Sequence, residues 1–135
     1  MKIDDVFHDT VRQRILHFLS VRSAQSFFDK EISEKTGISR GATNTALRQL
    51  AKLGLVECRK RGRMSFYSVN QGSPVIRYWK VLGNMLLIYP AVEHLKVISD
   101  KIILFGSAAE GTNIQESDID LFVLTNTPEK VRKAV

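Results

Sequence analysis

Two short motifs in the last third of the chain have the residue types needed to hold a phosphate group and a divalent cation. Gly106 and Ser107 directly follow the apolar run 102–105. Glycine lets a backbone approach a ligand closely, and neighbouring N–H groups with a serine hydroxyl can hold phosphate oxygens. Asp118 and Asp120 alternate on a segment expected to be extended, so both carboxylates point to one side. Such a pair suits Mg²⁺ accompanied by substrate phosphates, which indicates phosphoryl or nucleotidyl transfer.

A second group of residues has the composition of a DNA-binding surface. Residues 1–73 hold 13 basic and 7 acidic side chains, whereas residues 74–135 hold 7 of each. The net charge of +6 therefore lies in the first half, which indicates a polyanionic partner. The side chains predicted to contact double-stranded DNA are Arg40, Thr43, Asn44 and Arg48 on the outward side of a helix, and Arg59, Lys60, Arg61 and Arg63 on a hairpin.

The elements that carry this basic surface follow a recognisable order. Apolar periodicity predicts a helix over residues 6–19, and Asp29 is placed to cap a second helix that ends at Gly37. Ser39 is placed to cap a third helix over residues 40–53. Two strand-like runs, 55–59 and 64–69, lie on either side of a turn that contains glycine. This pattern predicts a β-hairpin. Helix, helix, turn, helix and basic hairpin is the order of a winged helix-turn-helix domain.

The second half of the chain changes from helical to strand periodicity. Ser73 and Pro74 open a very apolar helix to about residue 88, with a thin polar stripe of Arg77, Lys80 and Asn84, and such a helix must be covered on more than one side. Pro90 is expected to end this helix, with a further short helix over 91–98. Residues 102–105 predict a buried strand and 119–124 a second strand, before a helix that begins near residue 127. The predicted fold class is therefore α+β.

Several classes of protein are excluded by composition. The single cysteine, Cys58, permits neither an internal disulfide nor a C-x-x-C metal site, and its place on a strand predicts a small buried group. The N-terminus lacks the pattern of a signal peptide. The run 81–92 is broken by Gly83, Asn84 and Pro90, so it is expected to be too short to span a bilayer. The expected location is the cytoplasm, without a membrane.

Both halves resemble known families. Residues 38–56, which end in LRQLAKLGLVE before a basic hairpin, resemble the recognition-helix region of bacterial and archaeal winged helix-turn-helix transcription regulators. The pattern G-S-x-x-x-G followed by S-D-x-D-L resembles the minimal nucleotidyltransferases of the DNA polymerase β superfamily. This second resemblance implies that Gly106 and Ser107 bind the nucleoside triphosphate, and that Asp118 and Asp120 are catalytic ligands of Mg²⁺.

The chain departs from the nucleotidyltransferase pattern in two ways. Glu110 stands where many members have arginine before the last glycine of the first motif. The family also uses a third carboxylate on a later strand, and after Asp120 the only acidic residue is Glu129, at the start of a helix. The strand-loop-strand-helix order over 100–135 corresponds to the start of the fold, as expected either for a domain truncated at its C-terminus or for a degenerate domain. The chain as given is therefore predicted to be catalytically inactive.

These observations lead to a three-part organisation and three hypotheses. Residues 1–73 form the DNA-binding domain, 74–99 are connecting helices that supply a homodimer interface through 75–88, and 100–135 form a partial nucleotidyltransferase-like domain. The favoured hypothesis is a DNA-binding transcription regulator whose appended domain has nucleotide and Mg²⁺ as expected ligands. The first alternative is a nucleotidyltransferase that modifies a protein or small molecule, in the manner of an antitoxin, and is active only in a longer chain. The second is an interaction module with neither activity.

Overall fold

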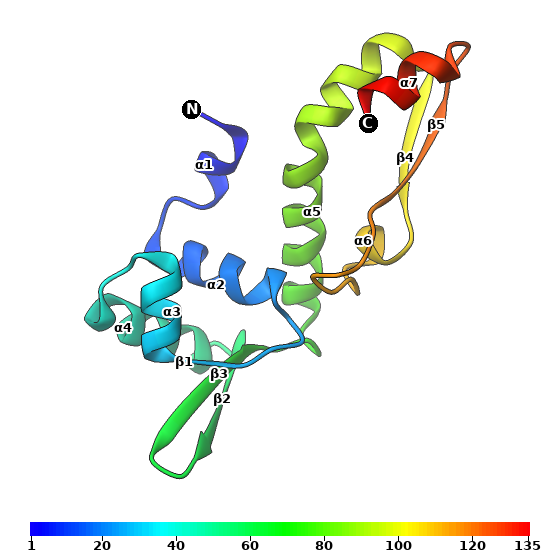
Figure 1. The fold of residues 1–135 in the computed structure, drawn as a ribbon. Helices are drawn as coiled ribbons and strands as arrows, with labels where there is room; N and C mark the ends of the chain where they lie inside the picture. The colour runs from blue at the N-terminus through cyan, green and yellow to red at the C-terminus, as the bar shows by residue number, and fades with distance from the viewer.

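The computed structural model describes residues 1–135, and Figure 1 shows two modules on opposite sides of one long helix. The N-terminal module contains α1 (Ile3–Phe7), α2 (Val11–Val21), β1 (Phe27–Phe28), α3 (Asp29–Thr36), α4 (Arg40–Lys52), β2 (Val56–Arg61) and β3 (Met64–Val69). The long helix α5 (Pro74–Leu95) continues into the 3₁₀ turn η1 (Lys96–Ile98). The C-terminal module contains β4 (Lys101–Phe105), α6 (Ser107–Glu110), β5 (Asp120–Leu124) and α7 (Pro128–Ala134). The predicted α+β class is confirmed.

The single helix expected over residues 6–19 is wrong, because Thr10 divides it into α1 and α2. The Thr10 hydroxyl accepts a hydrogen bond from the Gln13 amide at 3.2 Å, and the Gln13 side chain accepts one from the Thr10 amide at 3.0 Å. This reciprocal capping box starts α2 at Val11. The first residues of the chain are thereby free to form the separate helix α1, which lies alongside α5 in Figure 1.

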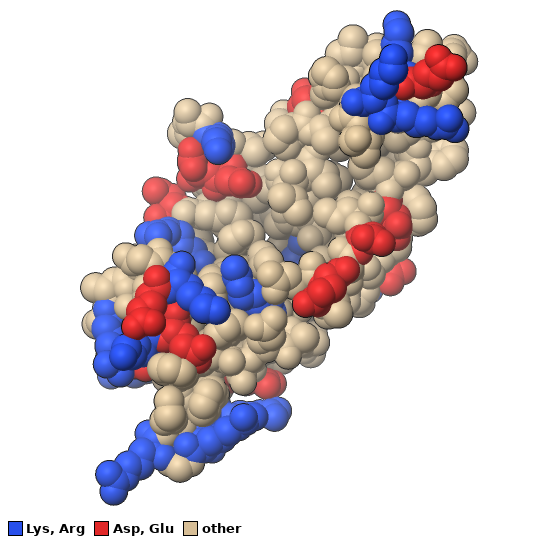
Figure 2. Space-filling model, viewed as in Figure 1, with Lys and Arg blue, Asp and Glu red and all other residues tan.

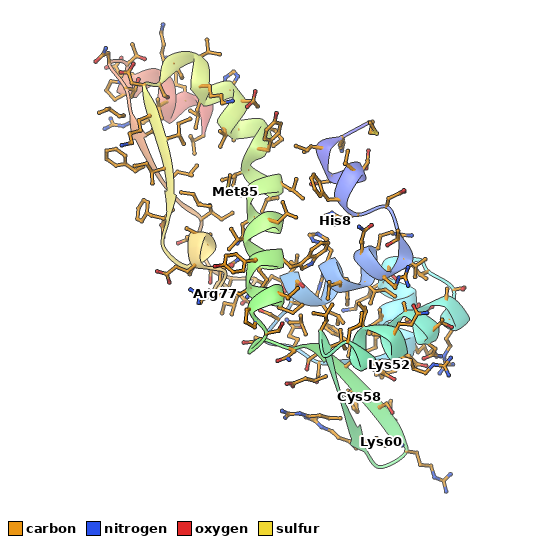
Figure 3. The ribbon with its side chains drawn as sticks, turned by 180° about the vertical axis from the view of Figure 1, so that it is seen from behind. His8, Lys52, Cys58, Lys60, Arg77 and Met85 are labelled. Atoms are coloured by element: carbon orange, nitrogen blue, oxygen red, sulfur yellow. The ribbon has the colours of Figure 1, made fainter.

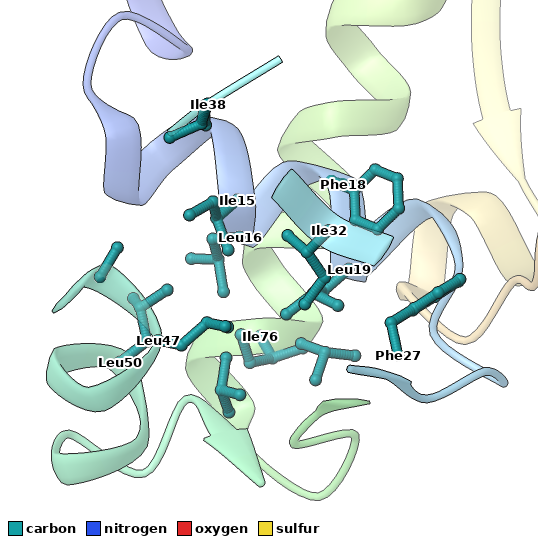
Figure 4. Close-up of a cluster of buried hydrophobic side chains, with 13 residues drawn as sticks. Ile15, Leu16, Phe18, Leu19, Phe27, Ile32, Ile38, Leu47, Leu50 and Ile76 are labelled. Carbon is teal, nitrogen blue, oxygen red and sulfur yellow. The ribbon is translucent and has the colours of Figure 1, made fainter. Parts of the chain in front are cut away.

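The N-terminal module is built on one apolar core. The strands pair antiparallel in the order β1-β3-β2, and α2, α3 and α4 pack beside them. Figure 4 shows the core side chains, and they include Ile76 of α5. Ile15, Leu19, Ile32, Leu47 and Ile76 are fully buried. Because the first turn of α5 contributes to this core, the start of the long helix packs as part of the N-terminal module.

The prediction that Pro90 ends the long helix is wrong. The helix continues through Pro90 to Leu95, and Figure 1 shows its upper part bending towards the C-terminal module. Proline removes one backbone hydrogen bond and bends a helix, but flanking apolar residues can keep it continuous. Buried Leu86, Ile88 and Leu95 anchor both sides of the bend. With η1, the helix covers 25 residues and by length and composition alone could cross a membrane, whereas the run 81–92 by itself is shorter than a span requires.

The C-terminal module is a two-stranded antiparallel sheet, β4 with β5, beside α6 and α7. The expectation that residues 102–105 form a buried strand is wrong, since burial alternates along both strands. Ile103, Phe105, Phe122 and Leu124 are between 39% and 51% exposed. Only one face of this two-stranded sheet is covered within the module, and the other apolar face remains open.

The polar stripe of α5 joins the two modules. The Arg77 side chain donates a hydrogen bond to the Glu110 carbonyl at 2.6 Å, and the Asn84 amide donates to the Ala108 carbonyl at 2.9 Å. The Lys80 ammonium donates to the Ser23 hydroxyl of the N-terminal module and to the Asn113 carbonyl of the C-terminal module. The polar stripe of α5 therefore holds α6 and the loop that follows it.

Candidate nucleic-acid interface and Gly-Ser/Asp-x-Asp site

The recognition helix α4 begins and ends where its residue types require. The Ser39 side chain accepts a hydrogen bond from the Ala42 amide at 3.3 Å and so caps the first turn. Gly37, with φ of +72°, makes the tight left-handed turn between α3 and α4. The buried stripe of α4 is Thr43, Ala46, Leu47 and Leu50. The opposite stripe is left free for a partner.

Thr43 is not on the outward face, and its predicted contact with DNA is wrong. Its side chain is fully buried, because it stands three and four positions before Ala46 and Leu47 on the inward stripe. Its hydroxyl has no hydrogen-bond partner. Thr45, which is exposed and hydrogen-bonds back to the Gly41 carbonyl, occupies the outward position instead.

Replacing Thr43 with valine should raise the free energy of unfolding by about 1 kcal/mol, because the change removes a buried hydroxyl that has no partner and conserves shape. Urea denaturation of both proteins measures this difference. DNA affinity should stay within twofold of the wild type, whereas Thr45→Val should lower affinity and leave stability unchanged. A destabilised Thr43→Val protein would show that the Thr43 hydroxyl has a hydrogen-bond partner in the folded protein.

The outward face of α4 holds the other predicted contacts. Arg40 and Arg48 are exposed, and Asn44 is half-buried between them. Two further residues that the sequence analysis missed, Gln49 and Arg12 of α2, are joined by a hydrogen bond of 3.3 Å at the edge of this face. Gln49 could have been found by placing Thr43 inward, since the opposite stripe is then 41, 45, 48, 49 and 52. Arg12 is on a different helix, so no pattern within α4 indicates it.

Asp29, the first residue of α3, positions the beginning of the recognition surface. Its carboxylate lies 3.4 Å from the Arg40 guanidinium. Burial alone would raise the pKa of the Asp29 carboxyl, but polar contacts from Asn44 and Arg40 outweigh burial and hold this pKa below its ordinary value. Asp29 is therefore ionised at neutral pH and fixes the direction of Arg40.

The wing is the β2–β3 hairpin, which closes with a two-residue turn between paired Arg61 and Met64. Gly62 in this turn has φ of +63°, a conformation that favours glycine. Strand alternation divides the four predicted wing cations between two faces. Lys60 pairs with Ser65, on the face that carries Tyr67 and points towards α4.

Arg59 and Arg61 lie on the other face of the wing. Arg59 forms an ion pair of 3.7 Å with Glu57, and the Arg61 guanidinium stacks 5.2 Å from the centre of the Phe66 ring. Both line a hollow against the loop 23–26, away from the recognition helix. The hairpin thus carries its charge on two surfaces, of which one is continuous with α4.

Between α4 and the wing lies a hollow of about 420 Å³. Its lining includes Arg40 and Asn44 from α4 and Arg63 from the wing turn. Figure 2 shows lysine and arginine side chains gathered along the wing and the adjoining helices. A concave surface with an exposed helix face on one side and cations on the other matches a duplex, whose groove receives the helix while phosphates meet the hairpin.

Cys58 is exposed, so the expectation of a small buried thiol is wrong. It pairs across the hairpin with Tyr67. Burial of the Tyr67 hydroxyl and the neighbouring Cys58 raise the pKa of Tyr67. Figure 3 shows Cys58 and Lys60 along the same hairpin. The wing projects from the core, so only its base residues Val56 and Val69 are buried.

The structure brings Gly106 and Asp120 together. Asp120 pairs with Phe105 at the end of the sheet, directly beside the turn at Gly106. Gly106 has φ of +73°, a conformation that favours glycine, and a β-carbon there would stand 2.6 Å from the Asp120 carboxylate. Ser107 starts α6 at this turn, and Asp118 and Asp120 are both exposed on either side of half-buried Ile119. Gly106 of the first motif therefore lies beside Asp120 of the second. No three His, Cys, Asp or Glu side chains are grouped to hold a metal ion.

Comparisons with known proteins identify both modules. A family model described as winged helix-turn-helix DNA-binding matches residues 29–57, and one described as nucleotidyltransferase domain matches residues 90–134. A search of curated proteins found no match.

Solved structures are similar to part of this chain at low sequence identity. The adhesin competence repressor AdcR of Streptococcus pyogenes is 15% identical, with 72% of this chain and 75% of that one covered and a TM-score of 0.50. A variant of ZitR from Lactococcus lactis is 21% identical, with 67% and 63% covered and a TM-score of 0.50. Another ZitR variant, in complex with DNA, is 19% identical, with 64% and 62% covered and a TM-score of 0.49. The chain spans about six tenths of the length of these ZitR structures. The chain is thus similar to winged helix-turn-helix DNA-binding domains over residues 29–57 and to nucleotidyltransferase domains over residues 90–134.

Proposed function

We propose that this chain is a transcription regulator that binds duplex DNA as a homodimer, with α4 in the major groove and the wing on the phosphate backbone. The hollow that joins Arg40, Asn44 and Arg63 is the observation that carries this proposal. It gives one continuous surface for base edges and phosphates. Because its proposed partner is DNA, we place the chain in the cytoplasm.

An apolar stripe on α5 supports the homodimer. Its members recur at alternating intervals of three and four residues, the spacing of a helix-helix seam. The stripe consists of Val75, Tyr78, Leu82, Met85, Tyr89 and Val92. Val75 and Tyr78 are 61% and 73% exposed, and Met85, which is labelled in Figure 3, is 44% exposed. The accessible surface of 8849 Å² also exceeds the roughly 7,100 Å² that a compact monomer of this mass would have.

The nucleotide and Mg²⁺ belong to this proposal as ligands of the C-terminal module. Gly106 and Ser107 would hold phosphate oxygens, and Asp118 and Asp120 would bind the cation that the phosphates bring. The tight fit of the Asp120 carboxylate against Gly106 supports a site assembled from both motifs. Two carboxylates supply only part of the ligand set for in-line transfer, so we propose binding without catalysis.

Asn44→Ala should reduce the preference for a cognate duplex by about tenfold, because an asparagine side chain discriminates among base edges in the major groove. A cognate sequence is first selected from a randomised pool with the wild-type chain. Fluorescence anisotropy then compares that duplex with a scrambled one for both proteins. An equal loss on both duplexes would mean that Asn44 contacts only the backbone, and that α4 is docked differently.

Mg²⁺ alone should bind weakly, and ATP should tighten its binding, because the phosphates complete the coordination. Isothermal titration with Mg²⁺, with and without a non-hydrolysable ATP analogue, measures both steps. Asp120→Asn should abolish the increase in Mg²⁺ affinity that the ATP analogue causes. Glu129→Gln, a change on α7, should leave that increase intact. Incubation with labelled ATP should transfer no label, and label transfer that depends on Asp118 would contradict the proposed lack of catalysis.

A further inference from the structure

A cavity of about 280 Å³ lies between the two modules and is separate from the DNA surface and the Gly-Ser/Asp-x-Asp site. Figure 2 shows the hollowed region between the modules. The wall comes from α2 and α5 on one side and from residues 113–119 on the other. Ile119 faces this cavity, whereas Asp120, next along the chain, lies against Gly106. The cavity is thus on the opposite side of the segment that carries the two carboxylates.

The cavity has a cation without a counter-ion at its base. Lys80 is only 8% exposed, and its ammonium donates to the Ser23 hydroxyl at 3.1 Å and to the Asn113 carbonyl at 2.6 Å. No carboxylate lies within ion-pair distance of Lys80, and the only acidic lining residue, Asp4, is on the exposed helix α1. An ammonium has three donors, so one remains for a ligand. A buried charge with neutral partners is costly, and an anion would offset that cost.

The rest of the lining suits a small ligand with an apolar body. Trp79, Leu87 and Ile119 supply apolar surface, and the side chains of Asn84 and Asn113, which also line the cavity, are hydrogen-bonded to each other. Burial, followed by the neighbouring His8, lowers the pKa of His17, which also lines the cavity and is therefore neutral at pH 7. Lys80 is the only lysine or arginine in the lining. A cavity of this size holds a single aromatic ring with a substituent, since about 150 Å³ accommodates benzene.

We propose that this inter-module cavity binds a small organic anion, with its carboxylate or similar group on Lys80 and its apolar body against Trp79 and Leu87. The site depends on neither the DNA interface nor the nucleotide site. Because Lys80 links Ser23 of the N-terminal module to Asn113 of the C-terminal module, a bound anion contacts the joint that sets their relative position.

The test uses the fluorescence of Trp79, the only tryptophan in the chain. Benzoate is titrated into the full chain, and benzamide, which has the same shape without charge, serves as the matched ligand. Benzoate should change the Trp79 emission saturably, and benzamide should bind with at least tenfold lower affinity. Lys80→Met should lower the affinity for benzoate at least tenfold without changing the affinity for benzamide. Lys130→Met on α7 should behave as the wild type.

Gly83→Leu provides a second variant that leaves Lys80 in place. Gly83 lines the cavity, and a β-carbon there meets only the His17 ring at 3.9 Å, so a larger side chain can enter the cavity and fill it. This variant should lose benzoate binding even if Lys80→Met fails to fold. Equal affinity for benzoate and benzamide, or unchanged benzoate binding in folded Lys80→Met or Gly83→Leu, would overturn the proposal.

Discussion

Replacing both Lys60 and Arg63 with alanine should weaken binding to any duplex by roughly 10- to 100-fold at 0.1 M salt. Each phosphate contact releases counterions from the DNA, and the affinity gained from that release is lost with the contact. These two cations lie on the side of the wing that continues into the recognition helix. The slope of log affinity against log salt should fall by about two units, since each contact contributes about 0.9. Anisotropy titrations at several salt concentrations measure both quantities.

Arg59→Ala with Arg61→Ala is the matched control, because it removes the same charge from the opposite face of the same hairpin. Arg59 is engaged by Glu57 and Arg61 by Phe66, so this pair should change the salt slope by less than one unit. Equal losses from the two double variants would show that the whole wing tip enters the DNA. A larger loss from the control pair would show that the other face of the wing is the DNA-binding one.

Replacing Tyr78 and Met85 together with glutamate should convert a dimer to a monomer. Both side chains project from the exposed stripe of α5, and like charges placed on facing seams repel. Affinity for a two-fold symmetric site should fall by about 100-fold or more, because the second half-site no longer benefits from linkage. Sedimentation velocity gives the oligomeric state, and anisotropy on one and two half-sites gives the affinities.

Leu87→Glu controls for the loss of apolar surface from the same helix. Leu87 is 69% exposed but lies outside the stripe, so this variant should remain a dimer. A wild-type chain that stays monomeric at high concentration would contradict the proposed interface. A monomeric Leu87→Glu protein would place the interface on another side of α5.

The sequence was sufficient to predict the elements whose local signals agree with their packing. Ser39, Gly37 and the apolar stripe of residues 46–50 all indicate α4, and α4 is found within one residue of its predicted end. Pro90 misled the prediction because its cost to a helix is local, whereas the anchoring of α5 by Leu86 and Leu95 comes from tertiary packing. Thr10 was missed because apolar periodicity continued across a capping box.

For the candidate sites, the sequence predicted the residue types more accurately than the directions in which their side chains point. Thr43 and Thr45 are chemically identical, and only the phase of the buried stripe separates an inward from an outward residue. The wing cations form one cluster in the sequence but two in space, since strand alternation depends on register. The role of Lys80 in joining the modules could not be predicted, because its partners Ser23 and Asn113 are distant in sequence.

The central claim is that the α4 face and the adjoining side of the wing contact DNA, and Cys58 can test it without any substitution. Cys58 is the only cysteine, is exposed, and shares the α4-facing side of the hairpin with Tyr67. The rate of its alkylation by iodoacetamide is measured with and without a saturating duplex, and again at high salt, where the complex dissociates. We predict that bound DNA slows alkylation several-fold and that high salt restores the free rate. An unchanged rate in a demonstrated complex would contradict this interface.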